Sequence, residues 1–487
     1  MREGALLLWL GLLATGNSVH GTDPPRLPAG LGDSWTGDAP SVPTGLEHDG
    51  SEGKVGEHGD QAQTEPLDAK QQSQKSKSGW GTFEQSGFLD TRAGMRTQDD
   101  PYEDQLSLGE TRLQLRLEKS GEWTRLRLVT DLLYDATQDS GNVDEVDLYR
   151  NRGFLDLREA SATFHASDHL DLKAGRQILT WGTGDMVFVN DLFPKDWQSF
   201  FVGRDVEYLK APTDAIKFSL FSSVANMDFV YTPRFVADRY LDGSRISFFN
   251  PALDDFIGED NTLKVEQPDD WFSDDEFALR LYRTIGSYEL AAYGYHGYWN
   301  SPSGYQPATD RYTFPALSVY GASVRGPVIR GIGNIEFGYY DSTSDSSGND
   351  PLVRNSELRF LVGYEQEVAR NFNVGLQYYL EYMMDYDAYR SNLPPDTQAR
   401  DEERHLLTLR LTYLALNQDL KLSLFTYWSP SDEDGYTRPL VEYKLNDQLT
   451  MQAGANWFFG RYNHTFFGQL EDNSNVYLAV RYNFSFD

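Results

Sequence analysis

Charged side chains recur at every second position in several segments of this 487-residue chain. In the segment 111–118, Arg112, Gln114, Arg116 and Glu118 alternate with leucine or threonine residues. Side chains two residues apart point to the same face of an extended strand, so such a segment presents a row of guanidinium, amide and carboxylate groups. The pattern favours the binding or passage of polar molecules.

No catalytic or metal-binding motif accompanies these rows. The chain has no Cys, which excludes disulfides, thiolate metal sites and a cysteine nucleophile. Its eight His are scattered, and none lies in a nucleophile motif such as Gly-x-Ser-x-Gly. We therefore expect no catalytic residues, no bound metal and no cofactor.

The chain is acidic and rich in aromatic residues. It carries 43 Lys and Arg against 74 Asp and Glu, and 14% of its residues are aromatic. The net charge of −31 repels phosphate backbones, which argues against nucleic acid as a partner. The mean hydropathy of −0.55, with no long apolar run beyond the N-terminus, excludes a helical membrane protein. A polar mean hydropathy combined with many aromatic residues is typical of a transmembrane β-barrel. The apolar residues of its lipid face and the polar residues of its lumen face cancel in the mean hydropathy.

The N-terminus has the pattern of a secretory signal peptide. Arg2 precedes an apolar stretch at 5–13, and small residues follow as far as Gly21. The alternative, a short buried helix, lacks apolar partners in the residues that follow. We predict a signal peptide at 1–21 and a disordered periplasmic extension at 22–79, which is rich in Pro, Gly, Ser and charged residues. Residues 80–487 then form the folded domain.

From about Phe83 onward the dominant pattern has a period of two residues. The leucines of 111–118 fall on one face of a strand, and the same alternation returns at 126–132, 358–365 and 407–413. A helix would scatter these apolar residues around its circumference. The sequence therefore predicts an all-β domain.

The predicted connections alternate between tight turns and long polar loops. The tight turns are predicted at Ser120-Gly121, Ser167-Asp168, Ala225-Asn226, Ile285-Gly286, Gly326-Pro327, Arg370-Asn371, Asn417-Gln418 and Asn446-Asp447. The long loops are predicted at 137–154, 180–212, 236–272, 299–312, 341–355, 385–402 and 459–473. This arrangement predicts a transmembrane antiparallel up-and-down β-barrel of about 18 strands. The alternative, a soluble propeller, would show a four-strand repeat, which we do not find.

The last predicted strand, at 475–486, favours the bacterial outer membrane. Every second residue from Val476 to Phe486 is apolar or aromatic, which resembles the C-terminal assembly signal of outer-membrane proteins, although Asp487 follows. We expect the assembly machinery to recognise this strand. The other expected partners are outer-membrane lipid and lipopolysaccharide.

If the apolar face of each strand meets lipid, the opposite face lines the lumen. By this parity the basic residues slightly outnumber the acidic ones, because many acidic residues fall in loops. Arg176 has the lipid-facing parity of Leu172, where an arginine costs about 2–4 kcal/mol, so we predict a β-bulge around Ala174-Gly175 that turns Arg176 inward. The predicted pore-lining residues are Arg112, Arg116, Arg125, Arg127, Asp131, Glu159, Lys173, Arg176, Gln177, Arg280, Arg359, Arg410, Arg438 and Arg481.

Several short motifs cluster between residues 157 and 197, namely Leu157-Arg158-Glu159-Ala160, Gly175-Arg176-Gln177, Trp181-Gly182, Asn190-Asp191 and Pro194-Lys195-Asp196-Trp197. Together they resemble the porin-like outer-membrane channels related to alginate-export proteins. The resemblance implies a passive conduit for solutes or acidic polysaccharide, with interior arginines that attract anions. Only Arg176 and Gln177 carry over from the family as motif residues.

The loop predicted at 180–212 is too aromatic to extend freely into solvent. Its large aromatic residues are Trp181, Phe188, Phe193, Trp197, Phe200 and Phe201. We predict that part of it folds into the barrel and narrows the pore. The alternative is that these rings pack against neighbouring loops. The charged residues predicted near the narrowing are Asp185, Asp191, Lys195, Asp196 and Arg204.

These patterns predict a porin-like channel for the passive passage of polar solutes, small or polymeric, with anionic solutes as one option. One alternative is a barrel that sheathes or scaffolds a partner protein. A less favoured alternative is a barrel enzyme with a Ser/His or Asp/His pair at its rim.

Overall fold

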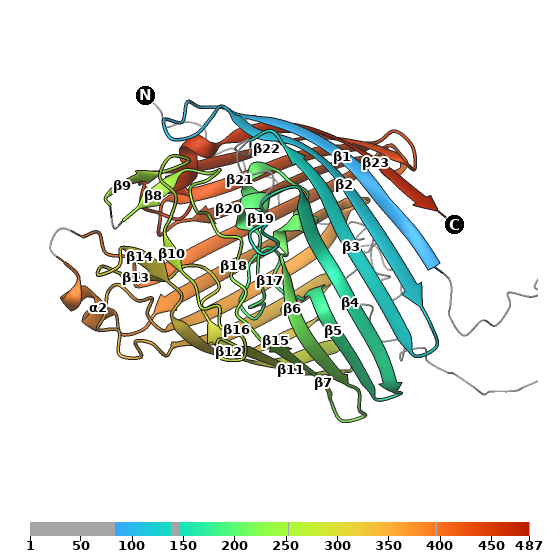
Figure 1. Ribbon diagram of the computed structural model, residues 1–487, viewed down its shortest axis with the longest axis horizontal. Helices are drawn as coiled ribbons and strands as arrows, with labels where there is room; N and C mark the ends of the chain where they lie inside the picture. The colour runs from blue at the N-terminus through green and yellow to red at the C-terminus, as the bar shows by residue number, and fades with distance from the viewer. Residues whose placement is uncertain (1–82, 138–145, 252, 395–396, 487) are drawn as a thin grey trace, which may run out of the picture. The chain divides into compact units, whose positions relative to one another are not determined.

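The computed structural model describes residues 83–137, 146–251, 253–394 and 397–486 (Figure 1). The predicted signal peptide and periplasmic extension lie outside the described residues. Eighteen strands form one sheet. They are β1 Phe83–Arg96, β2 Leu106–Ser120, β3 Thr124–Asp135, β4 Leu155–Ser167, β5 Leu170–Ile178, β6 Pro212–Leu220, β7 Asn226–Thr232, β11 Glu276–Ile285, β12 Tyr288–Tyr298, β15 Ala316–Val328, β16 Gly331–Ser342, β17 Glu357–Ala369, β18 Phe372–Met383, β19 Glu403–Ala415, β20 Leu420–Ser429, β21 Asp434–Lys444, β22 Leu449–Gly460 and β23 Asn475–Phe486.

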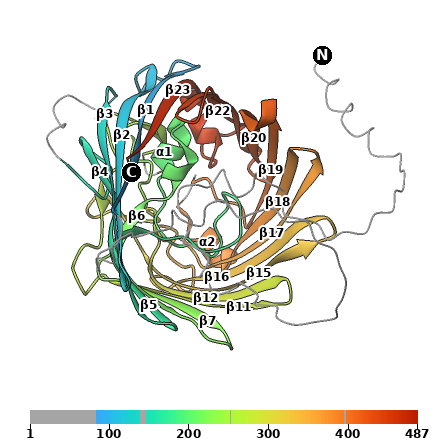
Figure 2. The same cartoon turned by 90° about the vertical axis from the view of Figure 1, so that its right-hand side faces the viewer.

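The sheet closes on itself. Each of these strands pairs antiparallel with the strand before and after it in this series, and β23 pairs with β1 so that Asp90 lies opposite Arg481. Figure 2 shows the resulting ring of strands. Closure leaves no free sheet edge, which is the condition for a β-sheet to cross a lipid bilayer. The predicted antiparallel barrel of about 18 strands is confirmed.

The alternation of side chains explains why these residues form a barrel wall. In β23, Val476, Leu478 and Val480 are exposed on the outer face, whereas Tyr477 and Ala479 between them are buried. An outer face of aliphatic and aromatic side chains matches the hydrocarbon of a membrane.

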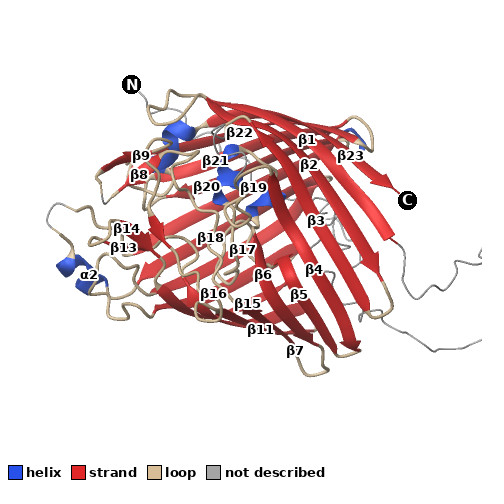
Figure 3. Ribbon diagram, in the orientation of Figure 1, coloured by secondary structure: helices blue, strands red, loops and turns tan. Residues whose placement is uncertain are grey.

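Smaller elements lie in the loops, several of them at one end of the barrel (Figure 3). None of the helices in the described residues is long and apolar enough to cross a membrane. These elements are α1 Trp197–Val202, η1 Val206–Leu209, β8 Phe248–Asn250, β9 Asp255–Ile257, β10 Val265–Glu266, β13 Gly304–Gln306, β14 Arg311–Thr313, α2 Tyr386–Asn392 and η3 Gly468–Asn473, while η2 Leu416–Gln418 forms the turn between β19 and β20.

Seven of the eight tight turns lie where the sequence predicts them, and one does not. The strand β15 continues through Gly326 and Pro327, which pair with Gly333 and Ile332 of β16. The turn follows at 329–330, where Ile329 adopts a positive φ of 55°. The Gly-Pro pair therefore ends a strand rather than making a turn. On the opposite end, two shorter connections at 97–105 and 430–433 were not predicted.

The predicted bulge at Ala174-Gly175 is wrong. The pairing of β5 with both β4 and β6 continues without a register shift through Ala174 and Gly175. The shift in this region lies in β4 instead, where Val129 pairs with Glu159 and Thr130 with Leu157. The bulge there places Arg158 and Glu159 on the same, lumen-facing side.

Arg176 therefore keeps the parity of Leu172 and lies opposite Asp214 in the strand register. It is nevertheless buried, with 5% of its surface exposed. Its guanidinium donates hydrogen bonds to the carbonyl oxygens of Leu157 and Leu148 at 2.7 and 2.6 Å and to Asp214 at 3.2 Å. Coverage by the loop before β4, and not a bulge, removes this arginine from lipid.

Candidate functional site

The loop between β5 and β6, residues 179–211, folds into the barrel, and we refer to it as the inward loop. In Figure 2 its helix α1 lies inside the ring of strands. Its side chains and carbonyl groups contact lumen-facing residues on most of the barrel wall, as the following contacts show. The aromatic residues that predicted an inward position are the ones that pack there.

The first part of the inward loop crosses from β5 to β16 and β20. The amide of Gly184 donates a hydrogen bond to Glu336 on β16 at 2.7 Å. Asp185 pairs with Arg410 on β19, and the amide of Asp185 donates to Gln377 on β18 at 2.7 Å. These contacts hold the first part of the inward loop against one wall of the lumen.

The loop then returns toward the wall from β6 to β16. Tyr340 on β16 donates its hydroxyl proton to the carbonyl of Val189 at 2.5 Å, and Asn190 Nδ2 donates to Glu336 at 2.8 Å. Phe193 is buried in an apolar cluster that includes Tyr295 and Trp299 from this wall. The loop is thus held by hydrogen bonds and by apolar packing on the same side.

The second crossing contains the helix α1. Asp196 caps its N-terminus by accepting a hydrogen bond from the amide of Ser199 at 2.7 Å. Phe201 packs edge-on against Tyr436 and Phe458, at ring-centre distances of 5.5 and 5.3 Å. The helix ends at Gly203, whose φ of 95° suits glycine.

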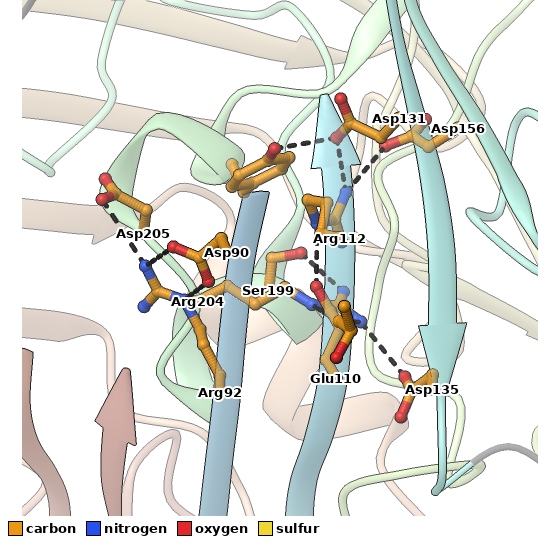
Figure 4. A network of polar contacts seen from close by, with 12 residues as sticks. Asp90, Arg92, Glu110, Arg112, Asp131, Asp135, Asp156, Ser199, Arg204 and Asp205 are labelled. Atoms are coloured by element: carbon orange, nitrogen blue, oxygen red, sulfur yellow. Dashed lines mark hydrogen bonds and ion pairs between the residues drawn. The ribbon is translucent and has the colours of Figure 1, made fainter. Parts of the chain in front are cut away.

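The segment after α1 meets a buried belt of ionic groups on β1, β2, β3 and β4 (Figure 4). Arg204 pairs with Glu110 at 2.7 Å, and Glu110 also accepts from Arg112 Nε at 2.8 Å. Arg112 in turn contacts Asp131 at 2.6 Å. Because every member has an opposite charge within contact distance, burial of these groups is compensated.

A second set of buried pairs surrounds Asp205, which follows the helix. Arg481 lies 3.4 Å from Asp205, and Arg92 lies 3.7 Å from it. Burial raises the pKa of Asp205, but the guanidinium groups of Arg481 and Arg92 outweigh this effect and hold the pKa below its ordinary value. Asp205 is therefore a charged anchor of the inward loop at neutral pH.

Another loop, residues 233–275, supports the inward loop from its outer side. Arg239 bridges Asp156 of β4 at 2.7 Å and Asp196 of the inward loop at 3.1 Å. Asp238 accepts a hydrogen bond from the amide of Lys195 at 2.7 Å. Burial raises the pKa of Asp238 above its ordinary value, against the hydrogen bonds that stabilise its charged form.

The structure separates the five predicted constriction residues into two groups. Asp191 and Lys195 pair with each other at 3.0 Å and are buried, as are Asp196 and Arg204. Asp185 alone keeps about a third of its side chain exposed, at 36%. Four of the five therefore anchor the inward loop, and Asp185 is the one with a substantially exposed side chain.

The predicted pore-lining residues other than Arg176 have the parity of the lumen face, and many are already engaged. Arg127 pairs with Glu159, and Lys173 lies 3.6 Å from the same carboxylate. Gln177 is fully buried and donates to the carbonyl of Ala215 at 2.9 Å. Further lumen pairs join Arg280 to Glu289, Arg359 to Glu357 and Arg481 to Asp90.

Sequence reasoning missed several members of the buried belt. Asp90 and Arg92 on β1 share the parity of the buried Phe88, so alternation in this strand would have identified them. Arg158 was hidden by the bulge in β4, which breaks the alternation. Arg239 lies in a loop, where parity gives no signal.

The histidines form no metal centre in the described residues. His165 and His169 have the His-x-x-x-His spacing, which the sequence prediction overlooked, but they flank the turn between β4 and β5. His165 Nδ1 lies 2.9 Å from Asp171, and His405 Nδ1 lies 2.8 Å from the hydroxyl of Tyr378. Neither pair includes a serine side chain. His296 Nδ1 lies 3.0 Å from Ser318 Oγ, but His296 is exposed on β12 and no carboxylate contacts it among the described residues.

Solved structures share this architecture. The chain is similar to OccAB3 of Acinetobacter baumannii, with a TM-score of 0.50, 12% sequence identity, and coverage of 83% of this chain and 99% of that one. It is similar to OccAB4 of the same organism, with a TM-score of 0.50, 10% identity and the same coverages. No protein-family model matches the sequence, and no curated protein matches it. At such identities the likeness shows the fold, which is the 18-stranded barrel of porin-like outer-membrane channels.

Proposed function

We propose that this chain is a passive channel for small polar solutes in the bacterial outer membrane, and that the inward loop sets its narrowest cross-section. The observation that carries the proposal is the path of this loop inside a closed barrel. The amide of Gly184 donates to Glu336 on β16 at 2.7 Å, and Arg92 on β1 donates to the carbonyl of Gly203 at 2.9 Å. Anchors on well-separated strands keep the loop across the lumen.

The pairing of charged residues in the lumen leads us to expect that the channel distinguishes only weakly between anions and cations. The resemblance to alginate-export channels implies an anionic or polymeric solute drawn in by interior arginines. The inward loop, however, brings Asp185 to Arg410 and Asp205 to Arg481, and these carboxylates offset much of the positive field. We therefore favour small solutes of either sign over an acidic polymer.

The proposed membrane contacts follow from the outer face of the barrel. The exposed side chains of β23, such as Leu478 and Tyr482, would contact lipid and lipopolysaccharide. We also propose that this strand is the assembly signal, because it alternates apolar and polar residues and closes the barrel against β1.

Two other functions receive less support. A sheath for a partner protein needs an open lumen, whereas Phe200 and Phe201 of the inward loop fill part of this one. A barrel enzyme needs a nucleophile, a base and a group that orients the base, and His296 beside Ser318 has no carboxylate partner among the described residues. A channel for small solutes, in contrast, is compatible with a lumen that the inward loop fills in part.

Reconstitution of the purified chain into a planar bilayer with a salt gradient tests the proposal. We expect discrete conductance steps and a reversal potential near zero, because the lumen charges are paired. A complete lack of conductance in a chain that is folded, judged by heat-modifiable migration, would contradict the channel. A strong anion preference would instead contradict the assignment of solute class.

A further inference from the structure

We propose that the loop end of the barrel carries a binding site for neutral saccharides, separate from the pore. A pocket of about 340 Å³ lies between the β8–β9 hairpin and the connection from β22 to β23. Its size falls at the lower end of the range for small-molecule sites, about 300–1,000 Å³. The residues that carry the proposal are Phe256, Arg461, Tyr462, Asn463, Gln469 and Asp472.

Two aromatic rings among the lining residues are held in place by neighbours. Phe256 stacks on Tyr102 at a ring-centre distance of 5.7 Å with an interplanar angle of 19°. Tyr462 contacts His464 at 5.5 Å, and the guanidinium of Arg461 lies 5.2 Å from its ring centre. The electron-rich faces of such rings attract the C–H groups of a sugar ring, and rings that are already ordered lose little entropy on binding.

Tyr462 is 41% exposed in a connection at the loop end, outside the barrel wall where aromatic residues meet lipid. It lines the pocket together with Phe256. Aromatic side chains combined with a few polar groups around a concave site are typical of small-molecule binding sites.

The polar lining residues match hydroxyl groups. The side-chain amides of Asn463 and Gln469 each carry a donor and an acceptor, and the carboxylate of Asp472 accepts two hydrogen bonds. Gln469 is oriented by its own hydrogen bond to the carbonyl of Phe466 at 3.1 Å. Neighbouring hydroxyl groups of a sugar both donate and accept, so this set pairs with them.

The charges of the pocket favour a neutral ligand. Its one cation, Arg461, is already paired with Glu433 through contacts of 3.1 and 2.9 Å. Glu471 and Asp472 then leave the lining negative. Phosphate or carboxylate groups would be repelled, so an acidic polysaccharide does not fit this site.

Two glycines shape the base of the pocket. A side chain at Gly460 would place Cβ 2.5 Å from Cα of Gly468, and a side chain at Gly468 would place Cβ 2.2 Å from the carbonyl oxygen of Tyr462. Only glycine permits this close approach of the two chain segments. The pocket is therefore built by the backbone and does not depend on a chance arrangement of side chains.

The pocket lies at the end of the barrel with the longer loops, which faces outward in outer-membrane barrels. A neutral saccharide there has two sources, a free oligosaccharide or the sugars of lipopolysaccharide. The probes are maltotriose, cellotriose, the anionic trigalacturonate, and a neutral outer-core oligosaccharide from lipopolysaccharide. Each is titrated calorimetrically into the full chain in detergent.

We expect at least one neutral probe to bind, and trigalacturonate to bind more weakly. Tyr462→Ala should weaken binding by about tenfold, Tyr462→Phe should retain it, and Asp472→Asn should weaken it. Trp271→Ala, which removes another exposed ring of the loops, is the matched control and should leave binding unchanged. Preference for the core oligosaccharide identifies lipopolysaccharide as the source, and preference for the free sugars identifies a soluble ligand.

The proposal is overturned if no neutral probe binds at millimolar concentration, if trigalacturonate binds best, or if Tyr462→Ala and Trp271→Ala have equal effects. The bilayer conductance of Tyr462→Ala should equal that of the unmodified chain. This separates the saccharide site from the channel, because either can fail while the other stands.

Discussion

Asp185 in the inward loop and Arg410 on β19 form a two-pronged ion pair, in which Arg410 Nη2 lies 2.7 Å from Asp185 Oδ1 and Arg410 Nε contacts the other carboxylate oxygen. Both side chains stay partly accessible, at 36% for Asp185 and 23% for Arg410. The other charged residues predicted for the narrowing are buried anchors. Among the five charged residues predicted for the narrowing, Asp185 therefore has the most accessible side chain.

Removal of one partner of this pair should change the ion preference of the channel. Arg410→Gln leaves the carboxylate of Asp185 unpaired and should shift the reversal potential toward cation preference. Asp185→Asn should shift it in the opposite direction. Both are measured in a planar bilayer with a salt gradient, and Asp310→Asn, which alters an exposed loop pair with Lys264, is the control. Shifts of the same sign in the two variants would rule out a role of the pair at the narrowing.

Glu110 should be essential for stability because it joins two arginines in a buried site. Glu110→Gln removes the charge that Arg112 and Arg204 share, and loss of one partner of a buried pair costs about 3–5 kcal/mol. Glu433→Gln alters the exposed pair with Arg461 and should cost less than about 1 kcal/mol. Urea-induced unfolding in lipid vesicles measures both. Equal costs would mean that the buried belt does not stabilise the barrel.

Gly203 should tolerate no side chain. Its φ of 95° disfavours other residues, and a Cβ there would lie 2.4 Å from the ring of Tyr477. Gly203→Ala should therefore displace the end of α1 and make single-channel currents noisier. Gly294→Ala is the matched control, because nothing lies within 4 Å of its added Cβ. Quiet, unaltered currents in Gly203→Ala would show that α1 does not need this close packing.

The connection between β1 and β2 should become less stable as the pH rises. Burial raises the pKa of Glu103 from 4.5 to about 8, against the attraction of Arg96. The folded state then binds more protons than the unfolded state between these two values, so stability falls across this range. The protection factors of the amides at 97–105, which are corrected for the pH dependence of intrinsic hydrogen exchange, should be higher at pH 5 than at pH 8. Glu103→Gln should remove the difference, and a difference that persists in this variant would assign it to another group.

The sequence was sufficient to predict the barrel because alternate residues of each strand face lipid and lumen, and their polarity differs accordingly. Leu113 and Leu115 face outward and Arg112 and Gln114 inward, and the structure places them so. The positions of residues that depart from this alternation were predicted wrongly. Arg176 has the wrong parity for a lumen residue, and its burial depends on carbonyl groups of a loop whose path has no sequence signal.

The interior of the barrel was only partly predictable for the same reason. Aromatic content placed the inward loop correctly, since Phe200 and Phe201 need a buried surface. It did not indicate that Glu336 and Tyr427 would anchor the loop, because these contacts join residues more than 150 positions apart. The inward loop contributes five acidic and three basic residues, so it reduces the expected surplus of positive charge.

The inward loop is proposed to form the narrowest part of the channel, and a shortened loop tests this most directly. A variant in which residues 184–189 are replaced by two glycines loses the contacts to Arg410, Tyr427 and Tyr340. Single-channel conductance should rise, and larger neutral solutes should enter proteoliposomes. Shortening the exposed loop 384–402 by the same length is the control and should change neither. Unchanged conductance and an unchanged size limit in a folded inward-loop variant would contradict the account.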